Sequence, residues 1–359
     1  MKWFIILSAA VMLSLTQLTS CKHSTEPPIQ EPDTTSHNFV WEPPVLLGDG
    51  AGSGLYDVTI IDDTLAYAAG AVYRKDSSGT WDLNAYNLLK WNGMNWNPIR
   101  LQFYTICGQS GRTSYPASSV FAFGASDVWI AMDGSQIARW NGNVQTATMC
   151  LPVSFSIKKV WGGNANVIYA VGDGGNILRY DGSNWLKLSS GTTLDIRDVW
   201  GAAEPGTGRL QILAVASGNS PADGKKVLQI NGTAASSVPD DGLSWSLYGI
   251  WFVPGQKYYV VGAGIGQKDV LDSSPWSVYP SGVVTSYLSG CVRGNGVNDV
   301  FVVGSFMECV HFNGKSWYNY KDQIPFADGA LGRIAVKGNL AIAVGHVGQQ
   351  AVAIVGRRK

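Results

Sequence analysis

Residues 160–185 read VWGGNANVIYAVGDGGNILRYDGSNW, and looser copies of this stretch fill most of the chain after about residue 56. It contains the apolar runs Val160-Trp161 and 167–171, then residues 177–180, and a fourth run that begins at Trp185. Turns that contain glycine, asparagine or aspartate separate these runs. Short runs rich in β-branched and aromatic residues, joined by such turns, are typical of antiparallel strands. The stretch therefore predicts a sheet of four short strands, named a, b, c and d in chain order.

The first apolar pair recurs seven times at intervals of roughly 40 residues, with two insertions. The copies begin at Val58, Val120, Val160, Val199, Ile250, Cys291 and Ile334. In five copies the turn between the third and fourth runs carries Asn-Gly or Asp-Gly, which suits two-residue hairpins because both positions accept a positive φ. One such sheet cannot bury both of its faces, whereas a closed ring of them can. We expect an all-β fold, a seven-bladed β-propeller with four-stranded antiparallel blades.

The seventh copy lacks a strand d, because the chain ends soon after its third run. Residues 39–43, FVWEP, stand before the first copy, and their Trp-x-Pro pattern repeats Trp96-Asn97-Pro98 of the first strand d. We expect this N-terminal strand to complete blade seven and close the ring without an unpaired edge. We call top the face that carries the d-to-a and b-to-c connections. The chain before residue 39 would then leave from the bottom face.

Residues 1–21 have the features of an export signal, with Lys2 followed by an apolar run that is too short and too interrupted to span a membrane convincingly. Their last four residues, Leu-Thr-Ser-Cys, resemble the lipobox of bacterial lipoproteins, which implies that Cys21 carries the lipid anchor. An ordinary signal peptide that contains a cysteine is the alternative. Lys22 replaces the aspartate that retains such proteins at the inner membrane, so the resemblance implies the outer membrane, in either leaflet. Residues 22–38 are polar and proline-rich and predict a flexible tether before a propeller domain at 39–359.

The repeat pattern of VWG, AVG and YDG-x-x-W resembles that of bacterial lipoproteins with kelch-like or galactose-oxidase-like propellers. The resemblance covers about residues 56–355 and implies a fold without specifying a reaction. The chain lacks the paired glycine of true kelch repeats, and it supports no copper site and no sialidase-type aspartate box.

The charge composition and the spacing of the histidines and cysteines limit which partners and cofactors we expect the chain to bind. Lys plus Arg and Asp plus Glu number 26 each, so no net charge favours a nucleic acid. The histidines and cysteines lack metal-ligand spacing, so we expect neither a metal nor another cofactor; we expect His311 and His346 to be ordinary surface or hydrogen-bonded residues. Cys107 and Cys150 follow the outer strands of consecutive blades and could form a disulfide.

The sequence does not decide whether Cys291 and Cys309 form disulfides.

The long connections, at residues 75–86, 105–117, 216–225 and 234–245, fall on the top face, where function is usually added to a rigid scaffold. Their aromatic and charged side chains could bind a protein or a glycan, or could merely cover the ring. The candidate binding residues are Trp81, Tyr86, Arg112, Tyr115, Asp173, Asp240, Asp241 and Trp245.

The sequence shows no catalytic constellation, so we predict a non-enzymatic, monomeric envelope lipoprotein that binds a partner with its top face. One alternative is a carbohydrate-active hydrolase or lyase that uses carboxylates such as Asp173 or Asp240 near the central channel, since such enzymes need two carboxyl groups about 5 to 9.5 Å apart. Another is an assembly or anchoring factor for other envelope proteins.

Overall fold

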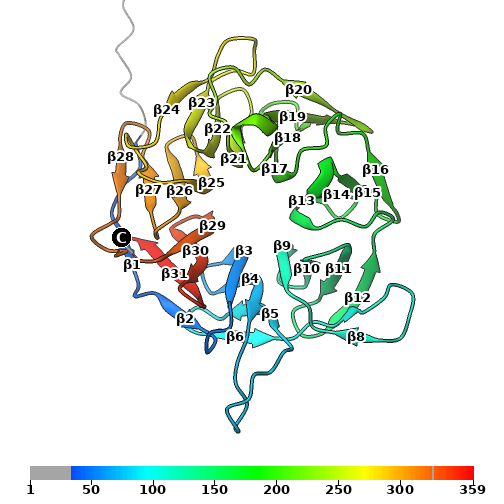
Figure 1. The fold of residues 1–359 in the computed structure, drawn as a ribbon. Coiled ribbons are helices and arrows are strands. Elements are labelled where there is room, and N and C mark those ends of the chain that lie inside the picture. Colours follow the sequence, from blue (N-terminus) through cyan, green and yellow to red (C-terminus); the bar gives the residue numbers. More distant parts are fainter. Residues whose placement is uncertain (1–33, 326) are drawn as a thin grey trace, which may run out of the picture. The chain divides into compact units, whose positions relative to one another are not determined.

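The computed structural model of the chain describes residues 34–325 and 327–359. These residues form a ring of seven antiparallel sheets, as predicted (Figure 1). The predicted signal peptide, Cys21 and the tether up to residue 33 lie outside the described residues. Within the described part of the chain, no helix has the length and apolar character needed to cross a membrane.

Six blades each take four strands from one continuous stretch of chain, with strand a innermost. Blade 1 consists of β3 (Gly54–Asp62), β4 (Leu65–Val72), β5 (Tyr86–Trp91) and β6 (Trp96–Ile99). Blade 2 consists of β9 (Ala117–Gly124), β10 (Asp127–Met132), β11 (Gln136–Trp140) and β12 (Gln145–Cys150). Blade 3 consists of β13 (Ile157–Asn164), β14 (Val167–Gly172), β15 (Ile177–Tyr180) and β16 (Trp185–Leu188). Blade 4 consists of β17 (Ile196–Ala203), β18 (Leu210–Ser217), β19 (Lys225–Asn231) and β20 (Ala234–Val238). Blade 5 consists of β21 (Leu247–Val253), β22 (Lys257–Gly262), β23 (Gly264–Lys268) and β24 (Ser277–Tyr279). Blade 6 consists of β25 (Ser289–Gly296), β26 (Asp299–Gly304), β27 (Cys309–Phe312) and β28 (Trp317–Asn319). The connections hold a small hairpin and two short 3-10 helices: β7 (Phe103–Tyr104) with β8 (Arg112–Thr113), η1 (Asp173–Gly175) and η2 (Pro221–Asp223).

Blade 7 joins the two ends of the described chain. Its strands a to c are β29 (Gly329–Lys337), β30 (Leu340–Val347) and β31 (Gln350–Arg358), and the outer strand comes from the N-terminal side. This strand is in two pieces, β1 (Phe39–Trp41) and β2 (Val45–Leu47), which pair antiparallel with successive parts of β31. The prolines between the pieces have no N–H to donate to the sheet, which accounts for the gap. Closure by the N-terminal strand is confirmed, and β2 extends it beyond the predicted segment.

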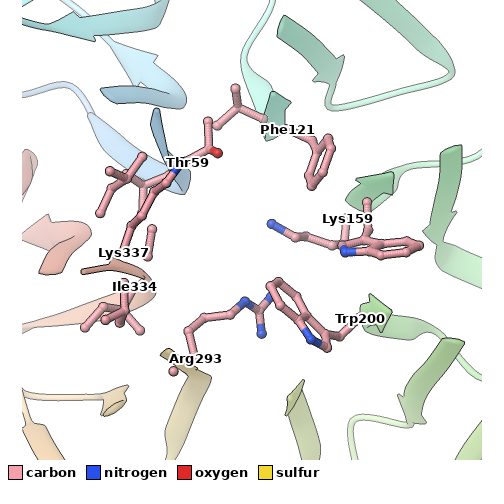
Figure 2. Close-up of a pocket in the computed structure, with 14 residues that line it drawn as sticks. Thr59, Phe121, Lys159, Trp200, Arg293, Ile334 and Lys337 are labelled. Carbon is pink, nitrogen blue, oxygen red and sulfur yellow. The ribbon is translucent and has the colours of Figure 1, made fainter. Parts of the chain in front are cut away.

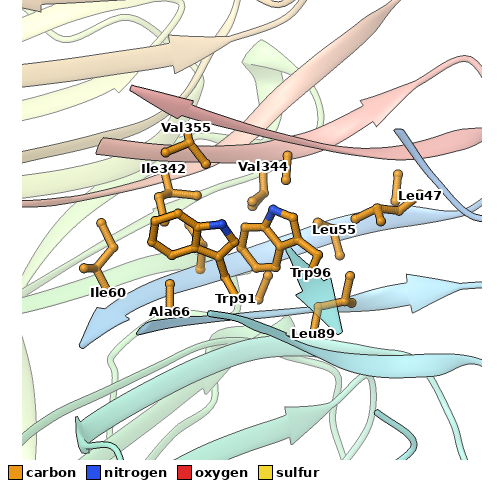
Figure 3. Packing of buried hydrophobic residues seen from close by; sticks show 14 of the residues in the cluster. Leu47, Leu55, Ile60, Ala66, Leu89, Trp91, Trp96, Ile342, Val344 and Val355 are labelled. Carbon is orange, nitrogen blue, oxygen red and sulfur yellow. The ribbon is translucent and has the colours of Figure 1, made fainter. Parts of the chain in front are cut away.

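Apolar packing between blades 7 and 1 holds the two ends of the chain together. Figure 3 shows Trp91 and Trp96 of blade 1 beneath Ile342, Val344 and Val355 of blade 7. The two indole centroids lie 6.3 Å apart. Aromatic side chains of this size each remove roughly 150 to 250 Å² of surface from water, so the junction is stabilised mainly by burial.

The chain enters the propeller at the bottom face, as the direction of strand d requires. The backbone N–H of Thr35 donates to the carbonyl of Asn313 in the c-to-d turn of blade 6, and Lys359 donates to the carbonyl of Asn38. The Tyr320 hydroxyl donates to the His37 carbonyl at 2.9 Å. Among the described residues, hydrogen bonds with the ring therefore begin at Thr35, within the predicted tether.

Two details of the predicted repeat are wrong. In blade 6, Val292 pairs with Val302 as Val160 pairs with Ala170 in blade 3, so this copy begins one residue after Cys291. The Cys291 side chain is fully buried, which explains its resemblance to an apolar strand residue. Residues 234–238 were assigned to a connection but form β20. Their sequence AASSV lacks apolar alternation because most of this outer strand faces solvent.

Cys107 and Cys150, whose pairing the sequence left open, form a disulfide with Cα atoms 6.0 Å apart. It ties the connection that carries β7 and β8 to the outer strand of blade 2. Cys291 and Cys309 are free and buried. Burial raises the pKa of the Cys309 thiol, which favours the unreactive protonated form.

Candidate functional site

Every strand a carries a β-bulge near its start, at the top of the channel. The pairing with strand b passes over one residue in each blade. These seven bulge residues are Tyr56, Ser118, Lys158, Arg197, Tyr248, Gly290 and Gly332. A bulge leaves its extra residue unpaired and turns that residue out of the regular alternation of side chains. The fold therefore places one structurally equivalent residue per blade around the channel mouth.

The glycine of the AVG pattern explains the bulge. In five of the seven blades it lies in strand b and pairs with the residue just before the bulged residue. A Cβ on Gly262 would lie 1.8 Å from the Ser246 carbonyl oxygen, and one on Gly172 would lie 2.0 Å from that of Ser156. Strand a approaches strand b too closely at these points for a side chain, so the repeated glycine makes room for the bulge.

The bulge residues surround a pocket of about 410 Å³, which we call the mouth pocket. Its lining includes six of the seven bulge residues, together with Arg333 and His346 of blade 7 and Asp133 of blade 2. The pocket combines cationic, aromatic and hydroxyl side chains. Such a mixture, contributed by rigid strands rather than by mobile loops, suits recognition of a polar chain segment.

Two of the three cations at the mouth are neutralised by neighbouring carboxylates. Lys158 Nζ lies 3.0 Å from Asp173 Oδ1, and Arg197 Nη2 lies 3.4 Å from Asp195 Oδ2. The Arg197 guanidinium also donates to the side chain of Asn219 at 2.7 Å and stands 5.7 Å from the centroid of the Tyr248 ring.

The third cation, Arg333, is bound by carbonyl groups instead. Its Nη1 donates to Gly290 and Gly332, and its Nη2 donates to Arg197. Among the described residues, no carboxylate forms an ion pair with Arg333. The mouth pocket therefore has a guanidinium whose charge is not neutralised by direct contact.

A layer of buried ion pairs lies directly below the mouth. Lys159 Nζ contacts both carboxylate oxygens of Asp57, at 2.7 and 2.6 Å. Arg293 binds both oxygens of Asp198 at 2.9 Å. Ser119 donates to Asp57 and accepts from the Val160 backbone, so it joins blades 1, 2 and 3. We call this set the polar layer; its two pairs are each neutral and link blade 1 with blade 3 and blade 4 with blade 6.

Below the polar layer lies a smaller pocket of about 160 Å³. Figure 2 shows Lys159 and Arg293 extending into it, with Phe121 and Trp200 on the same side of the channel as Lys159. The Arg293 guanidinium carbon stands 4.9 Å from the centroid of the Trp200 ring. This lower pocket and the mouth pocket lie at the two ends of one channel, with the polar layer between them.

None of the eight predicted binding residues is among the described residues that line the mouth pocket. Asp173 lies nearest to it, through its ion pair with Lys158. The other seven belong to three separate sectors of the top face, so the structure does not bring them together.

The first sector is the b-to-c loop of blade 1. Its Trp81 forms an isolated bridge with Lys75, whose Nζ stands 5.0 Å from the indole centroid. Tyr86 packs between Arg74 and Arg100, at 5.5 and 4.0 Å from the ring centroid. Both aromatic side chains therefore have cationic partners within their own blade.

The second sector is the connection between blades 1 and 2. The Arg112 guanidinium lies 4.0 Å from the ring centroid of Tyr104 and donates to Thr148. Tyr115 packs against the apolar cluster between these blades, and its carbonyl accepts from the side chain of Asn87.

The third sector is the connection between blades 4 and 5. The Asp240 and Asp241 carbonyls accept from the backbone of Leu243 and Trp276, which shapes the loop. Trp245 is 39% exposed. Since Asp240 does not line the mouth pocket, the structure gives no support for a pair of carboxylates formed with Asp173 there.

The two histidines predicted to be ordinary residues, His311 and His346, lie in different environments. His311 is fully buried, with Nε2 2.9 Å from Asp299 Oδ1 and Nδ1 2.8 Å from His37 Nδ1, so it is a hydrogen-bonded histidine, as expected. His346 is exposed at the mouth pocket. No group of three or more His, Cys, Asp or Glu side chains in the described part of the chain is arranged to hold a metal ion.

Sequence reasoning missed the mouth residues, although a signal for them exists. In six copies, the bulge residue stands two positions before the first residue of the apolar pair used to align the repeats. The residue types there differ from copy to copy, so no motif marks them.

Comparison with known proteins finds similarity only at the level of structure. No family model matches the chain, and no curated protein does. A YCF48 structure with a D1 peptide bound is 17% identical, with a TM-score of 0.63, and the match covers 93% of this chain and 99% of that one. YCF48 from Cyanidioschyzon merolae is 13% identical over 88% and 98% of the two chains, with a TM-score of 0.58. The WD40 propeller domain of Doa1 is 11% identical over 90% and 98%, with a TM-score of 0.59. The chain thus has the β-propeller fold of these structures.

Proposed function

We propose that this chain is a non-enzymatic protein-binding scaffold that holds a segment of its partner at the mouth pocket. The observation that carries the proposal is the set of seven bulges, six of which place a residue at a single site, the mouth pocket. Bulges next to binding sites are commonly used to aim side chains. The propeller of similar structure that holds a D1 peptide supports a peptide as the bound group.

The proposal includes export, a lipid anchor at Cys21 and residence at the outer membrane as a monomer. The motive for the anchor is the Leu-Thr-Ser-Cys tetrad that ends the predicted signal. Because residues 35–38 contact the bottom face, a membrane anchor before them would favour an orientation in which the mouth pocket faces away from the lipid. Labelling with radioactive palmitate tests the anchor: wild type should be labelled and Cys21→Ala should not. Equal labelling of both forms would refute it.

Site-specific photo-crosslinking in cells tests the scaffold function. A photoreactive amino acid at Tyr56 or Tyr248 should give a discrete crosslinked protein band. The same group at Tyr318, which is 41% exposed on the outer strand of blade 6, is the control and should not give that band. A result in which the mouth positions give no protein adduct, while the purified protein binds a glycan array, would replace the protein partner with a glycan.

A further inference from the structure

Arg333 occupies a position at the mouth pocket that lacks a negative partner. Its three hydrogen bonds all go to backbone carbonyls, which orient the guanidinium without neutralising it. A guanidinium has five N–H donors. The three bonds use both N–H groups of Nη1 and one N–H group of Nη2, so the second N–H group of Nη2 has no acceptor in the described part of the chain, whereas Nε is buried.

The surrounding charges leave this group without a carboxylate of its own. The charge of Arg333 helps to lower the pKa of Asp198 in the polar layer, but both oxygens of Asp198 accept from Arg293. The two ion pairs of the polar layer are each neutral, as are the pairs that Lys158 and Arg197 form at the mouth. Asp133 is the remaining carboxylate that lines the pocket, but it is exposed, and its Oδ1 accepts from Ser156. Solvent screens an exposed charge far more than a buried one.

Space for a ligand exists beside Arg333. In blades 6 and 7 the bulge residues are Gly290 and Gly332, so these two bulge positions carry no side chain. A Cβ built on Gly332 would meet no atom within 4 Å, which shows that the position opens into free space. Tyr56 and Tyr248 stand at other points of the rim and offer rigid aromatic surface.

We propose that the mouth pocket takes a carboxylate of the bound peptide and that Arg333 is the residue that binds it. The proposal rests on the proposed scaffold function and names the chemistry of its partner. Arginine binds carboxylates through strong charge-assisted hydrogen bonds, so a carboxylate here supplies both the acceptor and the negative charge that Arg333 lacks. An acidic side chain and a free chain terminus carry the same group, and the experiment separates them.

The test uses the purified protein on arrays of random heptapeptides, printed with free C-terminal carboxyl groups and again as amides. Peptides with Asp or Glu and peptides without them are scored separately. Wild type should bind only peptides that retain a carboxylate. Binding of acid-containing peptides whether or not they are amidated would identify a side chain, and binding of peptides with free termini whether or not they contain Asp or Glu would identify a terminus.

Four variants complete the design. Arg333→Gln should weaken binding about 10- to 100-fold, the loss of one charge-assisted contact, and Arg333→Lys should restore part of it. Gly332→Phe should block the pocket while leaving every charge in place. Gly124→Phe is the matched control, because a Cβ there also meets no atom within 4 Å but the residue lies at the bottom end of β9; it should bind like wild type. Circular dichroism confirms that each variant is folded.

The experiment distinguishes failure of the carboxylate proposal from failure of the scaffold function. If wild type binds amidated, acid-free peptides equally well, and Gly332→Phe abolishes that binding while Arg333→Gln does not, the scaffold function stands and the carboxylate proposal is refuted. If no peptide binds wild type, the peptide-binding function fails and the carboxylate proposal fails with it.

Discussion

Replacing Arg293 with methionine should destabilise the propeller strongly, because it leaves Asp198 charged and buried without its counter-ion. Asp198 has no exposed surface, and both of its carboxylate oxygens accept from Arg293. Burial by itself would raise the pKa of Asp198. The charge and hydrogen bonds of Arg293, with smaller contributions from Arg333 and Lys159, instead lower this pKa below its usual value. The carboxylate is therefore held ionised chiefly by the group that the substitution removes.

Breaking a buried pair by removing one partner typically costs about 3 to 5 kcal/mol of unfolding free energy. An unfolding entropy of roughly 2.1 cal/mol/K per residue makes 1 kcal/mol worth about 1.5 °C for a propeller of this length. Arg293→Met should therefore lower the melting temperature by roughly 4 to 8 °C. Methionine keeps much of the aliphatic volume against Trp200, so a cavity contributes little to this change.

Thermal unfolding followed by circular dichroism at neutral pH measures the effect. The control is Arg209→Met: Arg209 binds both oxygens of Glu204, at 3.1 and 2.7 Å, but its side chain is 76% exposed. Exposed pairs contribute little, so this variant should melt close to wild type. Adding Asp198→Asn to Arg293→Met should recover part of the loss by removing the buried charge. Equal melting temperatures for the two single Arg variants would refute the reasoning.

Three further predictions concern the closure, the disulfide and pH. Trp41→Ala should cost about 3 to 5 kcal/mol in denaturant titrations, since Trp41 is 6% exposed, whereas Val40→Ala, at a 39% exposed neighbour, should change little; equal effects would contradict closure by β1. Cys107→Ser should lower stability by at most about 4 kcal/mol, the entropy of a loop of this length, and adding reductant should bring wild type to the same value but leave the variant unchanged. Burial, His311 and Arg358 lower the pKa of His37 from 6.5 to about 4, so the unfolded chain binds more protons between these values and the melting temperature should fall as pH drops from 6.5 to 4. His37→Gln should flatten that slope, and an unaltered slope would refute the assignment.

The fold could be predicted because each blade repeats local signals that agree with one another. The Asn-Gly and Asp-Gly turns, the apolar runs and the glycine of the AVG pattern in strand b all specify the same four-stranded unit. Because the seventh copy of the repeat has no strand d, another segment of the chain had to supply it. Trp41 supplied the clue, since its spacing to Pro43 repeats that of Trp96 to Pro98.

The mouth pocket could not be predicted by the same means. The side chains that it presents, such as Lys158, Arg197 and Tyr248, share a position in the blade but no chemistry. A bulge is a local departure from strand alternation, so a pattern of period two passes over it. The lengths of the loops led instead to the prediction of Trp81, Arg112 and Asp240 as binding residues, but these residues lie in three separate sectors of the top face.

The polar layer bears on what the channel can do. Asp57 and Asp198 are 2% and 0% exposed, and their cations Lys159 and Arg293 are nearly as buried, so both pairs lie out of contact with bulk water. Each pair joins two blades that are separated by one blade, and separating a buried pair costs several kcal/mol. Within residues 34–325 and 327–359, the mouth pocket and the lower pocket share no lining residue. A group bound at Arg333 therefore lies above a layer of buried ion pairs that resist rearrangement, a geometry that suits holding a partner.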